Sequence, residues 1–150
     1  MANYTREIAH MLDRLNTKTL SLDKEGFYRN HLKAKINLLE MLMIKQIGAH
    51  GEIRLNQLIK VMEVDRNLVT TTLKRLIGLK LLQKRPDGND GRGQLVFMTP
   101  LGQTLYQELL KQQALELEFI LNDVTINEEK TILKFISKML QVHTDKYEIK

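Results

Sequence analysis

The amino-acid sequence predicts a mainly α-helical protein, of α+β type, in which about six helices accompany a single small β-hairpin. Apolar residues recur at helical spacing along most of the chain, and the period becomes that of a strand only between residues 81 and 99. Both prolines, Pro86 and Pro100, lie in or beside that short segment, so prolines interrupt no helix elsewhere. The 150 residues suffice for one core, and we expect a single domain over residues 1–150.

The composition restricts the class of protein. The chain contains no cysteine, which excludes disulfides and thiolate metal sites. Its first residues lack the apolar run of a signal peptide, and no stretch approaches the ~20 apolar residues of a membrane span. We therefore expect a soluble, cytoplasmic protein without a membrane partner.

The N-terminal part is predicted to hold two helices, over residues 4–20 and 30–48, with a polar break at 21–26 between them. A short extended piece at residues 53–55 follows. Asn56 is the expected cap of the brief helix that comes next.

A tight turn at residues 63–65 joins this brief helix to another over residues 66–79, for which Asp65 is the expected N-cap. Two β-prone runs, 81–85 and 95–99, then flank a stretch of glycine-rich turn chemistry. This pattern predicts a hairpin with a mobile tip over residues 86–93. Two long helices are expected after it, over residues 100–122 and 127–143.

Two short helices joined by a tight turn and followed by a hairpin form a winged helix-turn-helix, whose second helix enters the major groove of DNA. In the helix over 66–79, Val69, Leu73 and Leu76 are spaced to face the core. Arginine and asparagine can bond base edges, and threonine can contact a thymine methyl. The candidate DNA contacts on this helix are Arg66, Asn67, Thr70, Thr71, Lys74 and Arg75.

The positive charge is concentrated in the same region. Residues 64–94 hold 7 Lys/Arg against 3 Asp/Glu, whereas residues 100–150 hold 6 against 8, in a chain of net charge +5. No acidic residue occurs from Arg66 to Lys84, although an ordinary solvated helix face usually mixes both signs. The excess favours a polyanionic partner, double-stranded DNA.

The hairpin offers further candidates for DNA contact. Arg92 lies between Gly91 and Gly93, where a long side chain can extend into a minor groove. Lys84 and Arg85, at the base of the hairpin, are expected to contact phosphates, which supplies affinity without sequence information. The alternative is a solvated loop with incidental cations.

Three motifs of this region resemble the MarR (multiple antibiotic resistance regulator) family: Leu81-Leu82-Gln83-Lys84-Arg85, Asp90-Gly91-Arg92 and Met98-Thr99-Pro100-Leu101-Gly102. The resemblance implies that Asp90 orients Arg92. The sequence departs from the family pattern at Lys80, where a glycine usually follows the recognition helix, and in having one arginine at the tip of the wing instead of two.

The resemblance also implies a homodimer, formed by helices within residues 1–29 and 100–150 around a DNA-binding lobe at 30–99. The sequence favours a dimer independently, because the outer helices carry more apolar residues than one small core can bury. A two-fold dimer would present two recognition helices to a pseudo-palindromic operator. The predicted dimer contacts are Ile8, Met11, Leu12, Leu15, Leu117, Ile120, Leu121, Phe135, Ile136 and Met139.

Together these features predict a sequence-specific DNA-binding transcriptional regulator, and the resemblance implies that it is a repressor. No catalytic motif occurs, so we expect neither an enzyme nor a cofactor. Relatives imply that a small aromatic or anionic ligand can act as an effector. Its candidate lining residues are Met11, Leu15, Met41, Met43 and Ile44.

Three alternatives stay open at this point. The same fold could activate transcription, or it could serve as a protein-interaction module. A metal-responsive regulator is the third, with His10, His31 and His143 as its scattered candidates, although the wide histidine spacing predicts no metal site.

Overall fold

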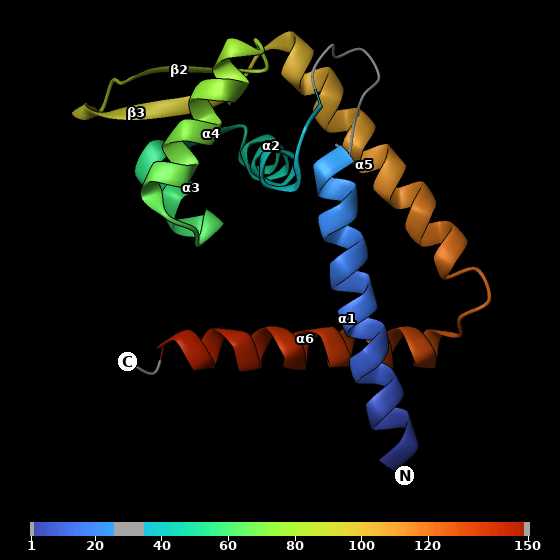
Figure 1. Ribbon diagram of the computed structural model, residues 1–150. Helices are drawn as coiled ribbons and strands as arrows, with labels where there is room; N and C mark the ends of the chain where they lie inside the picture. Colours follow the sequence, from blue (N-terminus) through green and yellow to red (C-terminus); the bar gives the residue numbers. More distant parts are fainter. Residues whose placement is uncertain (1, 26–34, 149–150) are drawn as a thin grey trace. The chain divides into compact units, whose positions relative to one another are not determined.

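Six helices and a three-stranded sheet make up the described part of the chain, residues 2–25 and 35–148 of a computed structural model (Figure 1). The predicted fold class, mainly α with a small winged β-structure, is confirmed. The chain divides into two compact units, residues 1–110 and 111–150, and each is described by itself. The elements are α1 (Ala2–Glu25), α2 (Leu38–His50), β1 (Glu52–Arg54), α3 (Leu55–Met62), α4 (Arg66–Gly78), β2 (Leu82–Asp87), β3 (Asp90–Met98), α5 (Pro100–Ile120) and α6 (Ile126–Glu148).

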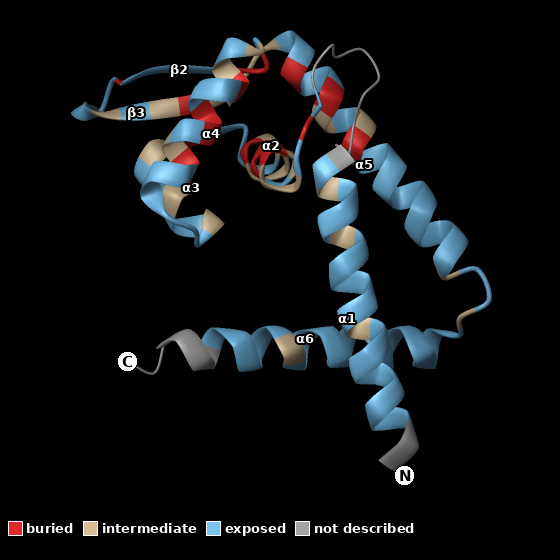
Figure 2. Cartoon of the chain, in the orientation of Figure 1, coloured by how far each residue is buried: buried red, intermediate tan, exposed pale blue. Residues whose placement is uncertain are grey.

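The core of the first unit lies between α2, α3, α4, the sheet and the first half of α5. Buried residues gather along α2 and α4 and at the start of α5, whereas α1 is mostly exposed (Figure 2). Val69, Leu73 and Leu76 are buried, which confirms the predicted inner face of α4. Met43 and Ile44 are also fully buried in this core, so their predicted place in an effector cleft is wrong.

The sheet has the order β1-β3-β2 and is antiparallel throughout. The strands of the hairpin extend further than predicted, because Asp87 pairs with Asp90 and only Gly88 and Asn89 remain as the turn. The predicted turn over residues 86–93 is therefore too long, while the mobility of the tip stays a prediction. The side chain of Asp87 closes the turn, since its Oδ1 accepts a hydrogen bond from the backbone N–H of Asn89 at 3.0 Å.

The first two helices have other bounds than the sequence predicts. α1 continues through the expected polar break to Glu25. α2 begins at Leu38 and not near residue 30, because the side chain of Asn37 accepts from the N–H of Glu40 at 2.8 Å and the Glu40 carboxylate accepts from the N–H of Asn37 at 2.9 Å. This reciprocal capping box fixes the helix start. Residues 30–34 lie outside the described residues.

The helix-turn-helix is built from α3 and α4. α3 begins at Leu55, so Asn56 lies inside the helix and is not its cap, as the sequence had suggested. Asp65 is the N-cap of α4, as predicted, and its side chain accepts from the N–H of Asn67 at 3.0 Å.

α4 ends in a Schellman motif, in which the N–H of Leu81 bonds the carbonyl of Leu76 and the N–H of Lys80 bonds the carbonyl of Ile77. Lys80 has φ of 62°, the left-handed conformation that usually selects glycine at this position. The departure from the family pattern at Lys80 therefore changes the residue but not the backbone.

α5 begins where the resemblance expects a helix start. The hydroxyl of Thr99 accepts from the N–H of Gly102 at 3.0 Å and donates to the carbonyl of Lys80 at 2.6 Å. A Cβ at Gly102 would lie 2.0 Å from the carbonyl oxygen of Leu81, so only glycine fits this close approach of α5 to the end of the recognition helix.

The second unit contains the end of α5 and the whole of α6, which continues past the predicted end to Glu148. Thr125 and Glu128 form a capping box at its start. Hydrogen bonds from the N–H and side chain of Thr125 hold the pKa of Glu128 below its ordinary value. None of the described helices is both long and apolar enough to cross a membrane.

Candidate nucleic-acid interface

The outer face of α4 carries most of the predicted base contacts. Arg66, Asn67, Thr71 and Lys74 are exposed, and Thr70 is half-buried with its hydroxyl donating to the carbonyl of Asn67 at 3.1 Å. The sequence prediction missed Leu68, which is 48% exposed at the start of the helix and could contact a thymine methyl. The face is therefore built of side chains that can bond or touch base edges.

A basic groove lies between the starts of α3 and α4 and the wing strand β3. Its volume is about 560 Å³, and none of its lining residues is acidic. Within it, the guanidinium of Arg66 donates to the amide oxygen of Asn56 at 3.3 Å. We call this site the basic groove; its lining residues are Arg54, Leu55, Asn56, Gln57, Arg66, Arg92, Gly93 and Gln94.

The groove unites two residues predicted from the sequence, Arg66 and Arg92, with others that the prediction missed. Arg54 comes to it because β1 pairs with β3 in a register that sets Arg54 opposite Leu95. Nothing local in the sequence indicates this pairing.

Asp87 forms an ion pair with Arg54 of the basic groove. Its carboxylate is 4% exposed, and its Oδ2 lies 2.9 Å from Nε of Arg54, whose side chain is 60% exposed. Because a buried carboxylate is costly without a charged partner, this ion pair couples the wing to the junction of β1 and α3.

The predicted phosphate contacts at the base of the hairpin lie on β2. Lys84 is exposed. Arg85 donates to the carboxylate of Glu52 at 2.6 Å, and its guanidinium stands 5.8 Å from the ring centre of Phe97. Both groups of this ion pair remain about half exposed, so Arg85 stays accessible to an external anion.

Two further predicted DNA contacts, Arg75 and Asp90, differ from the exposed residues described above. Arg75 turns to α2, where it forms an ion pair with the buried carboxylate of Glu40 and donates to the carbonyl of Lys35 at 2.9 Å. Its role as a DNA contact stays a prediction. The side chain of Asp90 lies outside the described residues, so its predicted action on Arg92 is likewise untested.

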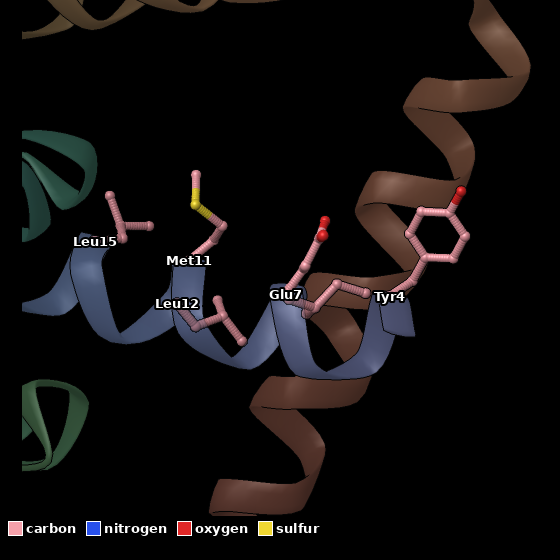
Figure 3. A pocket seen from close by; sticks show the side chains of 6 residues that line it. Tyr4, Glu7, Met11, Leu12 and Leu15 are labelled. Carbon is pink, nitrogen blue, oxygen red and sulfur yellow. The ribbon is translucent and has the colours of Figure 1, made fainter. Parts of the chain in front are cut away.

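The predicted dimer residues of the first unit form an open apolar face on α1. Figure 3 shows the side chains that line a shallow hollow of about 660 Å³ on this helix. Ile8, Met11 and Leu15 are largely exposed, and Leu12 is half-buried. The lining residues are Tyr4, Glu7, Ile8, Met11, Leu12 and Leu15.

The second unit also exposes apolar residues. Phe119, at 84%, is the most exposed large apolar residue of the described chain. The predicted dimer contacts divide between exposed residues (Leu117, Ile120, Phe135 and Ile136) and half-buried ones (Leu121 and Met139).

The structure describes two of the three histidines named as metal candidates, His10 and His143. Over residues 2–25 and 35–148, no group of three His, Cys, Asp or Glu side chains is placed to hold a metal ion. His31 falls among the residues that the structure does not describe.

The fold and the groove define a winged helix-turn-helix protein. The sequence profile of the MarR family matches residues 35–93, which span the helix-turn-helix and the start of the second wing strand. The resemblance noted from the sequence is thereby confirmed over this part of the chain.

Individual proteins are similar to the chain over most of its length. The chain is 21% identical over 133 residues to the uncharacterized HTH-type transcriptional regulator YwhA of Bacillus subtilis, covering 89% of this chain and 95% of YwhA. It has the fold of Streptococcus pneumoniae FabT in complex with DNA (TM-score 0.80, 20% identity, 95% of this chain and 99% of FabT). It is also similar to a mutant MarR from E. coli complexed with operator DNA (TM-score 0.69, 23% identity, 93% and 98%).

Proposed function

We propose that this protein is a sequence-specific transcriptional regulator that binds double-stranded DNA as a homodimer. The observation that carries the proposal is the outer face of α4 together with the basic groove, which share Arg66. They offer amides, hydroxyls and arginines, and no acidic residue lines the groove. Arginine and asparagine at the start of a recognition helix suit base edges in a major groove. The solved relatives FabT and MarR, each in complex with DNA, support the same partner.

The wing supplies the second contact of this proposal. Arg92 lies on β3 beside the groove, where a long cation can reach a narrow minor groove while α4 occupies the adjacent major groove. Lys84 and Arg85 add contacts to phosphates, which set the register of the protein on the duplex.

The homodimer is proposed from the apolar faces of the outer helices. Ile8, Met11 and Leu15 on α1 and Ile120 and Ile136 in the second unit are each at least 47% exposed in the single chain. Exposed apolar surface of this extent marks a protein interface. A two-fold dimer would cover it and present two copies of α4 about 34 Å apart, which suits a pseudo-palindromic operator.

Repression is the expected sign of regulation, because a dimer on a promoter-proximal operator blocks polymerase. The resemblance to MarR-family regulators carries this step. Release by a small aromatic or anionic ligand remains an expectation from the resemblance alone, since Met43 and Ile44 are buried in the core.

The decisive experiment is duplex binding over a range of salt concentrations. A duplex selected from a random library is compared with a scrambled duplex of equal length by fluorescence anisotropy. We expect the selected duplex to bind tighter, and log Kd to change with log salt by about 0.9 for each phosphate neutralised. A protein that binds neither duplex in dilute buffer contradicts the proposal and favours the protein-interaction module.

A further inference from the structure

Arg54 lines the basic groove and is also held by an ion pair with the buried Asp87. It is the last residue of β1 and immediately precedes α3, and its side chain lines the basic groove with Arg66 and Arg92. The three residues come from three different elements, so the folded lobe concentrates their charges at one place.

The ion pair with Asp87 fixes the guanidinium of Arg54. Asp87 uses Oδ1 for the N–H of Asn89 and Oδ2 for Nε of Arg54, at 3.0 and 2.9 Å. Apart from Arg54, the described residues give Oδ2 of this buried carboxylate no partner. The ion pair uses Nε of Arg54. Among the described residues, no acceptor is bonded to its two Nη groups.

The groove around these Nη groups suits an anion. Its polar lining consists of three arginines and the amide side chains of Asn56, Gln57 and Gln94, which provide donors for oxygen atoms. A guanidinium held by one carboxylate retains donors in a fixed plane, the geometry that binds a phosphate oxygen pair. The groove adjoins the first residue of α4, where a DNA backbone passes a recognition helix.

From this arrangement we infer that Arg54 is a phosphate contact of the bound DNA and that Asp87 is its positioning residue. The inference rests on the proposed function and adds to it a contact outside the recognition helix and the wing tip. Asp87 then stabilises DNA binding although its own charge is negative.

The test compares Arg54→Gln and Asp87→Asn in the full-length protein. Asparagine keeps an oxygen for the N–H of Asn89, so the turn of the wing retains its hydrogen bond. The control is Lys130→Gln, which removes one positive charge from an exposed site on α6, outside the lobe. Kd is measured for the selected and the scrambled duplex over a range of salt, with thermal melting to check each fold.

We expect Arg54→Gln to weaken binding to both duplexes roughly tenfold, because a charged hydrogen bond without base readout is lost. The salt slope should fall by about 1.8, one phosphate for each subunit of a dimer. Asp87→Asn should weaken binding as well, the opposite of what the removal of a negative charge does by simple electrostatics. Added to Arg54→Gln, it should cause no further loss.

Two results would overturn the inference while leaving the proposed function intact. The first is an affinity and slope for Arg54→Gln equal to those of Lys130→Gln, which would mean that Arg54 only neutralises Asp87. The second is tighter binding by Asp87→Asn. If Arg54→Gln does not fold, Arg54→Lys replaces it. Lysine keeps the charge but has a single donor nitrogen in place of the planar guanidinium, so it cannot reproduce the paired contact to Asp87 and a phosphate, and unchanged binding would overturn the inference too.

Discussion

At the scale of single residues, the polar side chains of α4 differ in their surroundings: some are open to solvent, and one is engaged inside the protein. Asn67 and Thr71 point to solvent at the start of the helix, where a base edge can be reached. Arg75 is engaged with Glu40, which is 1% exposed and caps α2 as well. The sequence predicts all three residues as DNA contacts, because it shows the helical spacing but not which neighbour packs beside the helix.

The base-reading role of α4 is tested by Asn67→Ala. We expect a loss of ~1–3 kcal/mol on the selected duplex and little change on the scrambled one, because a base contact discriminates between sequences. Lys84→Gln is the comparison, since the loss of a phosphate contact should affect both duplexes alike. Equal losses on both duplexes for Asn67→Ala would contradict its assignment as a base contact.

Arg75 is expected to stabilise the folded state through its ion pair with Glu40. Arg75→Met leaves the buried carboxylate of Glu40 without its partner, and urea unfolding should show a loss of about 2 kcal/mol. This lies below the cost for a fully buried pair, because the arginine is 44% exposed. A variant with unchanged stability and weakened DNA binding would instead restore Arg75 to the DNA contacts.

At the scale of elements, the helix ends explain how the recognition helix is held. The Schellman motif at Lys80 ends α4, the hydroxyl of Thr99 bonds the carbonyl of that same residue, and Gly102 packs against Leu81. The end of α4 is thereby joined to the beginning of α5. These contacts give a physical reason for the Thr-x-x-Gly pattern seen in the sequence.

Gly102→Ala tests this junction. Because the added methyl would collide with a backbone oxygen, we expect a loss of roughly 1–3 kcal/mol in urea unfolding. Gly78→Ala is the matched control, since it lies at the end of α4 with nothing within 4 Å of its would-be Cβ, and it should stabilise by about 0.5 kcal/mol. Equal effects of the two substitutions would show that the close approach is unimportant.

The elements also show how much of the fold the sequence could predict. Periodicity located the helices, the inner face of α4 and its cap at Asp65, because these depend on residues a few positions apart. The start of α2 was wrong because the Asn37–Glu40 capping box lies inside a continuous apolar pattern. Arg54 was missed because the pairing of β1 with β3, a long-range contact, brings it to the wing.

At the scale of the whole molecule, the apolar faces of the outer helices connect the fold to the proposed function. One chain presents a single recognition helix, and a pseudo-palindromic operator needs two. In the proposed homodimer, operator binding therefore depends on the exposed apolar residues of α1 and α6.

Ile136→Glu tests this dependence in the full chain. Ile136 is 55% exposed, so a charge there should leave a single chain folded but should be costly once buried in an interface. We expect the dissociation constant of the dimer, measured by sedimentation, to rise at least ~100-fold. Operator binding should be lost in parallel. Lys134→Glu, an exposed position on the same helix, is the control. A dimer of wild-type stability in Ile136→Glu would place the interface elsewhere.

A hydroxyl-radical footprint of the wild-type protein on its selected duplex tests whether the protein reads DNA as a pair. If two copies of α4 lie in successive major grooves, the protected sites should be mirrored about a centre, with half-sites about 10 base pairs apart. A single unsymmetrical patch, or no protection in dilute buffer, would contradict the claim that this fold reads DNA as a pair.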